Sequence, residues 1–559
     1  KPKLAAEHGA VGCLIYSDPR DDGFYRGEVF PDGPWRPGHG VQRGSVMDMP
    51  LYPGDPLTPG VGALPSAKRL DIKDVKTITQ IPVLPISYGD AQPLLEALDG
   101  PGAPSHWRGA LPLTYHIGPG PAKVHLKVQA NWEMKKIYNV VARINGSEFP
   151  DEWVIRGNHH DAWVNGAQDP ISGMVALMEE GRAFGELLKQ GWQPKRTMFF
   201  IGWDAEEQGL IGSTEWVEAH AEELQQNAAM YINTDSNGRG FLRIAGSHIL
   251  EKFINGVAHE VEDPQTQLSV WKRAQLRSIA NAGSAQARAR LRNRHDLRIS
   301  ALGSGSDYTA FLDHLGIASL NLGFGGMDGG GIYHSVYDDF YWYTHFADTD
   351  FVYGRALAQT AGTAAMRFAD ADLLPYNFTN FAETVSGYVD ELQKLAKNIR
   401  EEIIEQNRQI DEGVFAAMAD PRRKVALPEK DDIPPYLNFA PLENAVAAVK
   451  ESAERYKNAA AKFHQSGRKI PAGVNKKLIQ SERKLALQEG LPGRPWFKHQ
   501  MYAPGFYTGY GVKTLPAVRE AIEQKEWQDV EGHVATVAKV LTAFAEHVHG
   551  LAGEFEANR

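Results

Sequence analysis

The middle of the chain repeats one pattern, in which a short apolar run is followed at once by side chains that bind metals. Helical patterns over Ile171–Leu188 and Ser213–Gln226 separate these runs. Such alternation predicts an α/β domain with a mostly parallel sheet and helices on both faces. Ligands collect outside the carboxyl ends of the strands in such sheets, so the sequence predicts one shared site. The runs and the residues after them are Val154–Arg156 before His159, Met198–Trp203 before Glu206 and Glu207, and Tyr231–Asn233 before Asp235.

Two further residues complete a candidate metal set. Asp169 follows His159 by ten residues, and His334 lies in the segment YHSVYDDF. Imidazole and carboxylate are the ligands that zinc takes when no thiolate is available, and Cys13 is the only cysteine. Each residue alone is more often structural. The coincidence of three strand ends favours a zinc site.

The two adjacent glutamates make sense if they have different tasks. Asp169 is predicted to bridge two zinc ions, because a shared carboxylate holds two cations close enough to act on one water. Glu206 is then the general base that moves the proton of that water to the leaving amine. This division of tasks predicts hydrolysis. The remaining ligands are assigned as His159 and Asp235 on one zinc, and Glu207 and His334 on the other.

Two neighbours of the ligands are predicted to support them. Asp161 is expected to fix the tautomer of His159, because a ligating imidazole usually donates its other N–H to a carboxylate. Tyr333, beside His334, is a candidate donor to the tetrahedral oxyanion. A core tyrosine is the equal alternative for Tyr333.

The bulk properties exclude several other classes. A chain of 559 residues is too long for one core. Its formal charge of −10 argues against nucleic acid or an anionic membrane as the main partner. We find no apolar run that spans a bilayer, no His-Glu-x-x-His motif, no Gly-x-Ser-x-Gly motif and no P-loop.

The composition changes twice along the chain. The first 136 residues are rich in Gly and Pro, with β-like runs at Val11–Tyr16 and Val124–Val128. A strand–helix region follows over about 137–373, and helical patterns dominate from about 374. The helices expected there are Ala382–Asn407, Leu442–Phe463, Lys476–Gln488, Leu515–Gln524 and Val530–His549.

With these residues placed, the chain resembles the co-catalytic zinc exopeptidase family that includes glutamate carboxypeptidase II and the transferrin receptor. The resemblance covers nearly the whole length. It implies a β-rich protease-associated (apical) domain over 1–136, truncated at its N-terminus, a zinc peptidase domain over 137–373 and a helical dimerisation domain over 374–559, hence a homodimer. The motifs that carry it are GVQRG (Gly40–Gly44), GDPLTPG (Gly54–Gly60), WDAEEQGLIGSTEW (Trp203–Trp216), YINTDS (Tyr231–Ser236), GSGSDY (Gly303–Tyr308), YHSVY (Tyr333–Tyr337) and YAPGFYTGY (Tyr502–Tyr510).

The resemblance also bears on the metals. All five family ligands and the base are present at the positions assigned above, whereas the transferrin receptor has lost this set, so a receptor-only role is the weaker analogy. A structural calcium site is implied at Thr58, Val61 (through its carbonyl), Glu215 and Glu218. Glu215 and Glu218 lie three apart on one helical face, which suits an oxygen-ligand cation and equally suits a solvated helix face.

Departures from the family pattern concern the substrate. The family pattern has a lysine and an asparagine that bind a substrate carboxylate. This chain has Gly509 in place of that lysine and Ser45 in place of that asparagine. It also has Asn321 and Gly323 where the pattern has arginines. Gly or Asn cannot replace a cation that pairs with carboxylate, so we expect neutral or apolar side chains instead of glutamate. The substrate residues that the resemblance implies are Arg243, Ser304, Gly305, Ser306, Asp307, Asn321 and Tyr510.

The leading hypothesis is a two-zinc exopeptidase that cleaves short peptides at a terminus. We favour an aminopeptidase, with Asp307 or Asp328 as the partner of the substrate ammonium, over a glutamate-carboxypeptidase-type enzyme. A non-catalytic dimeric scaffold and a two-zinc amidohydrolase are the competing hypotheses. We expect an extracellular, periplasmic or membrane-anchored ectodomain, with any anchor upstream of Lys1.

Overall fold

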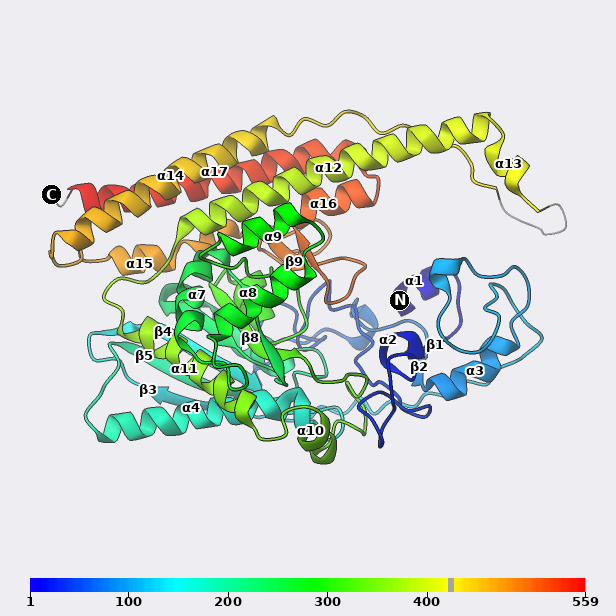
Figure 1. The fold of residues 1–559 in the computed structure, drawn as a ribbon, viewed down its shortest axis with the longest axis horizontal. Helices are drawn as coiled ribbons and strands as arrows, with labels where there is room; N and C mark the ends of the chain where they lie inside the picture. Colours follow the sequence, from blue (N-terminus) through cyan, green and yellow to red (C-terminus); the bar gives the residue numbers. More distant parts are fainter. Residues whose placement is uncertain (421–426, 558–559) are drawn as a thin grey trace.

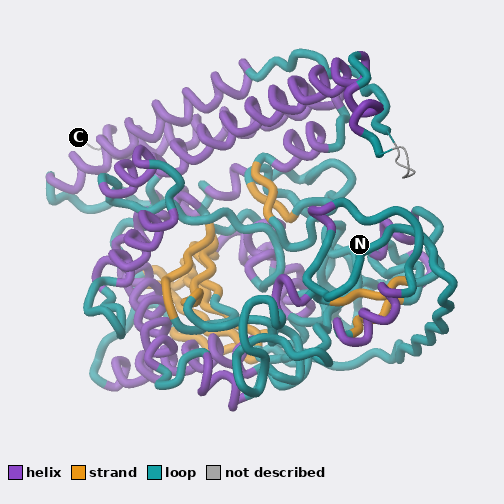
Figure 2. Tube along the Cα trace, turned by 45° about the vertical axis from the view of Figure 1, so that its right-hand side comes forward, coloured by secondary structure: helices purple, strands orange, loops and turns teal. Residues whose placement is uncertain are grey.

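The computed structural model describes residues 1–420 and 427–557. Figure 1 shows three regions along the chain: an irregular N-terminal part, a central sheet with its helices, and long C-terminal helices that lie side by side across one side of the molecule. Figure 2 shows the same division by secondary structure, because loops dominate the N-terminal part and strands gather in the centre.

The central sheet has six strands in the order β3-β5-β4-β6-β8-β7. Its four inner strands are parallel, and the edge strands β3 and β7 are antiparallel to their neighbours. The predicted α/β class with a mostly parallel sheet is confirmed. The strands are β3 (Val140–Ile144), β4 (Phe149–His159), β5 (Arg196–Trp203), β6 (Ala228–Asn233), β7 (Gly240–Gly246) and β8 (Ser319–Gly326).

Helices cover both faces of this sheet. On one face, α4 (Ser172–Lys189) packs against α11 (Val352–Asp370) and against β4. On the other face, α5 (Ile211–Ala219), α6 (Ala221–Asn227) and the short π-helix η5 (Ala310–His314) pack against the strands, with Phe311 stacked on Tyr231 at a ring distance of 4.0 Å. Ile171–Leu188 is confirmed as a helix.

The single helix predicted over Ser213–Gln226 is wrong, because the helix breaks at His220. The ring of His220 stacks on Trp216, and His220 Nδ1 lies 2.8 Å from the Trp216 carbonyl oxygen. The His220 N–H still donates to the Trp216 carbonyl at 3.0 Å, and the φ of −112° at His220 marks the break between α5 and α6.

The N-terminal part contains fewer strands than a β-rich domain requires. A parallel pair, β1 (Cys13–Tyr16) and β2 (Val83–Ile86), agrees with the run at Val11–Tyr16. The strand expected at Val124–Val128 is wrong: both valines are about half exposed, and no ladder partner pairs with them among the described residues. A small separate core consists of Tyr88, Ala103, Leu111 and Tyr115. Short helices α1 (Pro2–Glu7), α2 (Pro19–Asp22) and α3 (Tyr88–Glu96) complete this part.

The C-terminal part is helical, as expected. The predicted helix Lys476–Gln488 is nevertheless wrong beyond Ile479, where a turn leads into the short η6 (Glu482–Leu485). The turn brings Arg483 into the interior, where its guanidinium donates to the carbonyls of Leu224 and Ala228. The helices are α12 (Phe378–Asp411), α13 (Val414–Met418), α14 (Ala440–Gln465), α15 (Val474–Ile479), α16 (Pro516–Glu523) and α17 (Trp527–Ala557).

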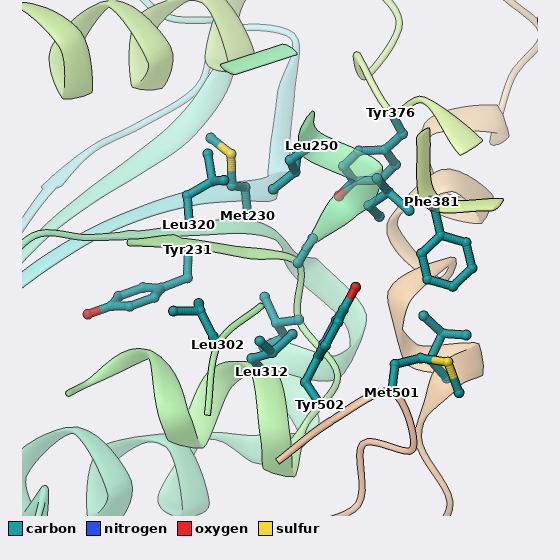
Figure 3. Close-up of a cluster of buried hydrophobic side chains, with 14 of the residues drawn as sticks. Met230, Tyr231, Leu250, Leu302, Leu312, Leu320, Tyr376, Phe381, Met501 and Tyr502 are labelled. Carbon is teal, nitrogen blue, oxygen red and sulfur yellow. The ribbon is translucent and has the colours of Figure 1, made fainter. Parts of the chain in front are cut away.

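The sheet region and the C-terminal helices share one apolar core. Figure 3 shows Leu250 and Leu302 from the sheet region in the same buried cluster as Phe381 of α12 and Tyr502, which begins β9 (Tyr502–Pro504). The Tyr502 hydroxyl lies 2.7 Å from His248 Nδ1, so a buried polar contact joins the two regions as well. None of the helices in residues 1–420 and 427–557 combines the length and apolar composition that a bilayer crossing requires.

Candidate active site

The three predicted strand ends meet at one edge of the sheet. In the parallel ladders, His159 at the end of β4 is level with Trp203 of β5, and Gly157 is level with Asn233 of β6. Each strand then enters a loop that carries carboxylates. The register therefore brings together side chains that lie tens of residues apart in the sequence.

Asp169 lies between the two histidines. Its Oδ1 is 3.3 Å from His159 Nε2, and its Oδ2 is 3.5 Å from His334 Nε2. The outer flanks are occupied by Asp235, 3.4 Å from His159 Nε2, and by Glu207, 3.0 Å from His334 Nε2. All five predicted ligands thus converge, and one carboxylate faces both halves of the set.

Glu206 lies in the same cluster. Its Oε2 is 4.0 Å from His159 Nε2, and the side chain belongs with His159 and Asp235 to one of two groups spaced closely enough to hold a metal ion. The other group is Asp169, Glu207 and His334. Adjacent glutamates therefore enter different halves of the site.

Asp161 connects two of the strand ends through its side chain. One carboxylate oxygen accepts the backbone N–H of Glu206 at 2.9 Å, and the other accepts that of Glu207 at 3.2 Å. His159 Nδ1 lies 3.1 Å from the backbone carbonyl of Asp161 and 3.5 Å from its carboxylate. The carbonyl is thus the nearer acceptor for His159, and the carboxylate mainly orients the glutamate loop.

Asp338 is a site residue that the sequence reasoning missed. Its carboxylate accepts the backbone N–H of Gln168 at 2.7 Å and that of Asp169 at 3.0 Å. Burial raises the pKa of Asp338 to about 7. The pair of aspartates four and five residues after His334 was the available signal; the second, Asp339, caps α10 (Phe340–Phe346) by accepting the Trp342 N–H.

The site places negative charge in a buried setting. Burial raises the pKa values of Glu206, Glu207 and Asp235, since desolvation disfavours the charged form. Burial opposes protonation of His334, but the Asp169 and Glu207 carboxylates outweigh it and raise its pKa to about 9. The cluster therefore favours any added positive charge.

The donor set fits zinc. His159 Nε2 is buried and has no hydrogen-bond partner among the described residues, although three carboxylates surround it. A buried ring nitrogen in this state is suited to a metal, and mixed nitrogen and carboxylate donors are those that zinc accepts. Two such ions would also neutralise the buried carboxylates.

A cavity of about 550 Å³ opens onto the cluster. Tyr333 forms part of its wall and stacks on His334 with a ring distance of 3.6 Å. The Ser306 hydroxyl donates to Asp235 Oδ2 at 2.6 Å. The predicted substrate residues that line the cavity are Arg243, Gly305, Ser306, Asn321 and Tyr510.

A second cavity of about 210 Å³ adjoins Tyr510. Ser304 lines it together with Ser45 and Gly509, two of the positions at which the sequence differs from the family pattern. Among the described residues, no charged side chain lines it; its remaining wall is Met47, Met49, Pro50 and Pro504. Neither proposed ammonium partner belongs to either lining. Asp307 is completely buried, and Asp328 accepts hydrogen bonds from Gly326 and Gln168.

The four predicted calcium residues come together at the junction of the N-terminal part and α5. Glu215 accepts the N–H groups of Asp55 and Ala63 and the Thr58 hydroxyl, the last at 3.3 Å. Val61 belongs to the same turn, since its N–H donates to the Thr58 carbonyl. Glu218 accepts the N–H of Gly60 and the indole of Trp496, while its Oε2 is buried without a partner in the described chain.

Two family models match this chain. Residues 139–347 match the model of peptidase family M28, and residues 437–549 match the transferrin receptor-like dimerisation domain. A probable glutamate carboxypeptidase of Arabidopsis thaliana, LAMP1, is 34% identical over 96% of this chain and 71% of its own length. The aminopeptidase NAALADL1 of Rattus norvegicus is 32% identical over 97% of this chain and 71% of its own length. Among solved structures, a peptidase M28 precursor from Shewanella amazonensis is 20% identical, with a TM-score of 0.36 over 66% of this chain and 62% of that one.

Proposed function

The chain belongs to peptidase family M28 and carries a transferrin receptor-like dimerisation domain, and on this basis we propose that it is a two-zinc exopeptidase for short peptides with neutral or apolar terminal residues. The family assignment confirms the predicted enzyme class, a zinc-dependent exopeptidase, so we set the receptor-like scaffold aside. The observation that carries the zinc count is the position of Asp169, which faces His159 with one oxygen and His334 with the other.

The zinc ligands are proposed as the sequence suggested them: His159 and Asp235 for one ion, Glu207 and His334 for the other, and Asp169 for both. When bound, such ions polarise a carbonyl and lower the pKa of water. Asp161 and Asp338 fix the loops that carry these side chains, because they accept backbone N–H groups of Glu206, Glu207 and Asp169.

Glu206 is proposed as the proton carrier. It is 7% exposed and lines the cavity, where it can accept a proton from the attacking water and pass it to the leaving amine. Tyr333 reaches the same cavity and is the proposed donor to the oxyanion of the tetrahedral intermediate.

The cavities support a preference for neutral or apolar residues. The smaller one has Ser45 and Gly509 at the positions where the family pattern places carboxylate-binding groups, and methionine and proline side chains form much of its remaining wall. In the larger one, the Arg243 guanidinium donates to the Phe324 carbonyl at 3.1 Å and lies over Gly323 and Gly325. One backbone-bound arginine is a weaker partner for an acidic substrate than a set of free cations.

Whether the enzyme cleaves at the amino or the carboxyl terminus of a peptide depends on the charged groups that line the two cavities. The acidic groups that line the larger cavity are Asp169, Glu206, Glu207 and Asp235, all in the proposed zinc cluster. Bound zinc would neutralise these groups, so they do not decide the terminus. Among the described residues no charged side chain lines the smaller cavity, where the family pattern places carboxylate-binding groups, and this favours an aminopeptidase. Carboxypeptidase activity is the second candidate, and Arg243 is the observation that favours it, as a cation in the cavity wall within reach of a free carboxylate.

Three further assignments complete the proposal. Residues 1–136 form a protease-associated domain, 137–373 the peptidase domain and 374–559 the dimerisation domain of a homodimer. Calcium binds between Thr58, Val61, Glu215 and Glu218, where a buried carboxylate oxygen lacks a partner among the described residues. The chain acts as an ectodomain or in the periplasm.

Hydrolysis of three substrates by the zinc-loaded protein tests the function. Leucine p-nitroanilide has a free amino terminus only, whereas N-acetyl-Ala-Leu and N-acetyl-Ala-Glu have a free carboxyl terminus only. We expect cleavage of the anilide and slow or no cleavage of both acetylated peptides. Preferred release of leucine or glutamate from the acetylated peptides would support the carboxypeptidase instead, and faster release of glutamate would contradict the neutral preference. Inertness toward all three would contradict exopeptidase activity.

A further inference from the structure

His334 adopts a backbone conformation that needs support from outside its own loop. Its φ is 54°, in the left-handed region that non-glycine residues seldom adopt. Two hydrogen bonds join it to Arg43 in the N-terminal part: the Arg43 N–H donates to the His334 carbonyl at 2.9 Å, and His334 Nδ1 lies 2.9 Å from the Arg43 carbonyl. The N-terminal part therefore contacts both the backbone and the ring of a proposed zinc ligand.

Arg36 contacts the same turn through its side chain. The residue is completely buried, its Nε pairs with Asp22 Oδ2 at 2.9 Å, and its Nη2 donates to the Tyr333 carbonyl at 3.1 Å. That carbonyl belongs to the peptide group that joins Tyr333 to His334. The guanidinium therefore fixes the orientation of the peptide plane that precedes His334.

Arg36 is itself held from three directions. Its backbone N–H donates to the Asp22 carbonyl at 2.9 Å, and its own carbonyl accepts the Tyr88 hydroxyl at 3.1 Å. The Asp22 carboxylate pairs with the Arg36 side chain, so the guanidinium has little freedom to turn away from Tyr333. A charged donor fixed in this way acts as a rigid support.

The loop ahead of His334 packs directly on this segment. A Cβ at Gly331 would lie 2.1 Å from the Asp22 carbonyl oxygen and 2.7 Å from the Arg36 nitrogen, and one at Gly329 would lie 2.1 Å from Pro34 Cγ. The indole of Trp342, after the turn, donates to the Pro34 carbonyl at 3.0 Å. Contacts before and after the turn show that the two segments are fitted to each other along their length.

We propose that Arg36 is a positioning residue for His334, which through the Tyr333 carbonyl aims the imidazole at Asp169 and Glu207 and so completes one of the two zinc sites. This inference rests on the zinc assignment in the proposed function. The alternative is that the Asp22–Arg36 pair only folds the N-terminal part. The two differ in their consequences: a positioning role weakens the zinc held by His334 selectively, whereas a general loss of folding weakens both.

Zinc affinity of each site, measured by competition with a chromophoric chelator, distinguishes these roles without any assay of activity. Arg36→Met removes the guanidinium, and Asp22→Asn/Arg36→Met also removes the carboxylate that the single change leaves unpaired. Arg26→Met in the same segment is the matched control, since Arg26 is exposed. Circular dichroism and thermal melting report whether each variant is folded.

We expect the zinc held by His334, identified as the one whose affinity His334→Ala lowers, to lose affinity by about 10-fold or more in both Arg36 variants, because loss of groups that orient ligands typically lowers metal affinity 10- to 100-fold. The other zinc and the Arg26→Met protein are expected to stay within about twofold of wild type. Unchanged affinities in folded Arg36 variants would overturn the inference while leaving the proposed function intact. Equal weakening of both zinc ions, or failure of both variants to fold, would also overturn it. Absence of zinc from the wild-type protein would instead contradict the proposed function.

Discussion

The Asp338 carboxylate accepts the backbone N–H of Asp169 at 3.0 Å. The second oxygen of Asp338 accepts the backbone N–H of Gln168. A single buried side chain therefore holds the backbone of Asp169 and of the residue before it. Asp169 is the residue that faces both histidines, and its orientation decides whether two cations can share it. The segment that supplies His334 therefore also supports the carboxylate opposite it.

Replacement of Asp338 by alanine is expected to lower both stability and zinc retention. Two buried N–H groups would lose their acceptor, at about 1–3 kcal/mol of unfolding free energy each. Denaturant unfolding of the apoprotein measures the first effect, and zinc content after dialysis measures the second. Asp350→Ala, at an exposed position near α11, serves as the control. Full stability and full zinc in Asp338→Ala would show that Asp169 is oriented by other contacts.

Glu206→Gln is expected to retain zinc and to lose about 10²- to 10⁴-fold in kcat, because the amide preserves shape but cannot accept a proton. Elemental analysis and steady-state kinetics on the same preparation measure the two quantities. Glu223→Gln on the exposed face of α6 is the matched control and should match wild type. A Glu206→Gln enzyme with near wild-type turnover would remove Glu206 from its proposed role.

How much of this could be predicted from the sequence depended on distance along the chain. The strand ends were predictable because each is a local signal, an apolar run followed directly by a ligand such as His159 or Asp235. The contacts of Arg36 and Arg43 with the His334 turn span almost 300 residues, and no periodicity marks them. Each looks like an ordinary charged residue in a Gly- and Pro-rich loop until the fold places it.

The errors in secondary structure have the same origin. Pattern alone could not distinguish a continuous helix from one that breaks at His220, because the break is a change in the backbone angles of one residue that no periodicity marks. The run at Val124–Val128 alternates as a strand does, yet a strand also needs a partner, which pattern does not supply. Asp307 was proposed as a partner for a substrate ammonium, and only the structure shows that it is buried.

Three histidines that burial holds in neutral form are expected to cost stability in mild acid. Burial lowers the pKa of His248 to about 3 and those of His314 and His547 to about 4. A histidine whose folded-state pKa is lowered contributes stability that is fully present above its unfolded value near 6.5 and is lost as pH falls toward the folded value. Several buried carboxyls have raised pKa values and act in the opposite direction, so the histidine contribution is measured by comparing variants with wild type in melting of the zinc-free protein at pH 5 and pH 7.5.

His547→Gln is expected to raise the melting temperature at pH 5 relative to that at pH 7.5, compared with the same difference in wild type, since one of the three groups can no longer gain a proton. His547 lies on α17, where its Nε2 is 3.2 Å from the Ser481 hydroxyl, and a glutamine amide can keep a hydrogen bond there. His464→Gln on α14 is the control, because His464 is exposed. The same difference between the two pH values in His547→Gln and in wild type would contradict the assignment of a neutral His547.

Calcium is expected to raise the melting temperature of the zinc-loaded protein, and Glu218→Gln to abolish the increment. Glu215 and Glu218 are buried together, and burial raises their pKa values to about 7 and about 8, so the pair gains from a divalent cation or from protons. Melting with calcium and with magnesium, each after removal of the other, measures the effect. An absence of any calcium-dependent shift would indicate that protons neutralise the pair.

Anomalous X-ray scattering at the zinc edge, from crystals of the zinc-loaded wild-type protein, tests the two-zinc site most directly. We predict two peaks beside the Asp169 carboxylate, one among His159, Asp235 and Asp169, the other among Glu207, His334 and Asp169. A single peak, or two peaks of which only one contacts Asp169, would contradict the shared carboxylate on which the proposed chemistry depends.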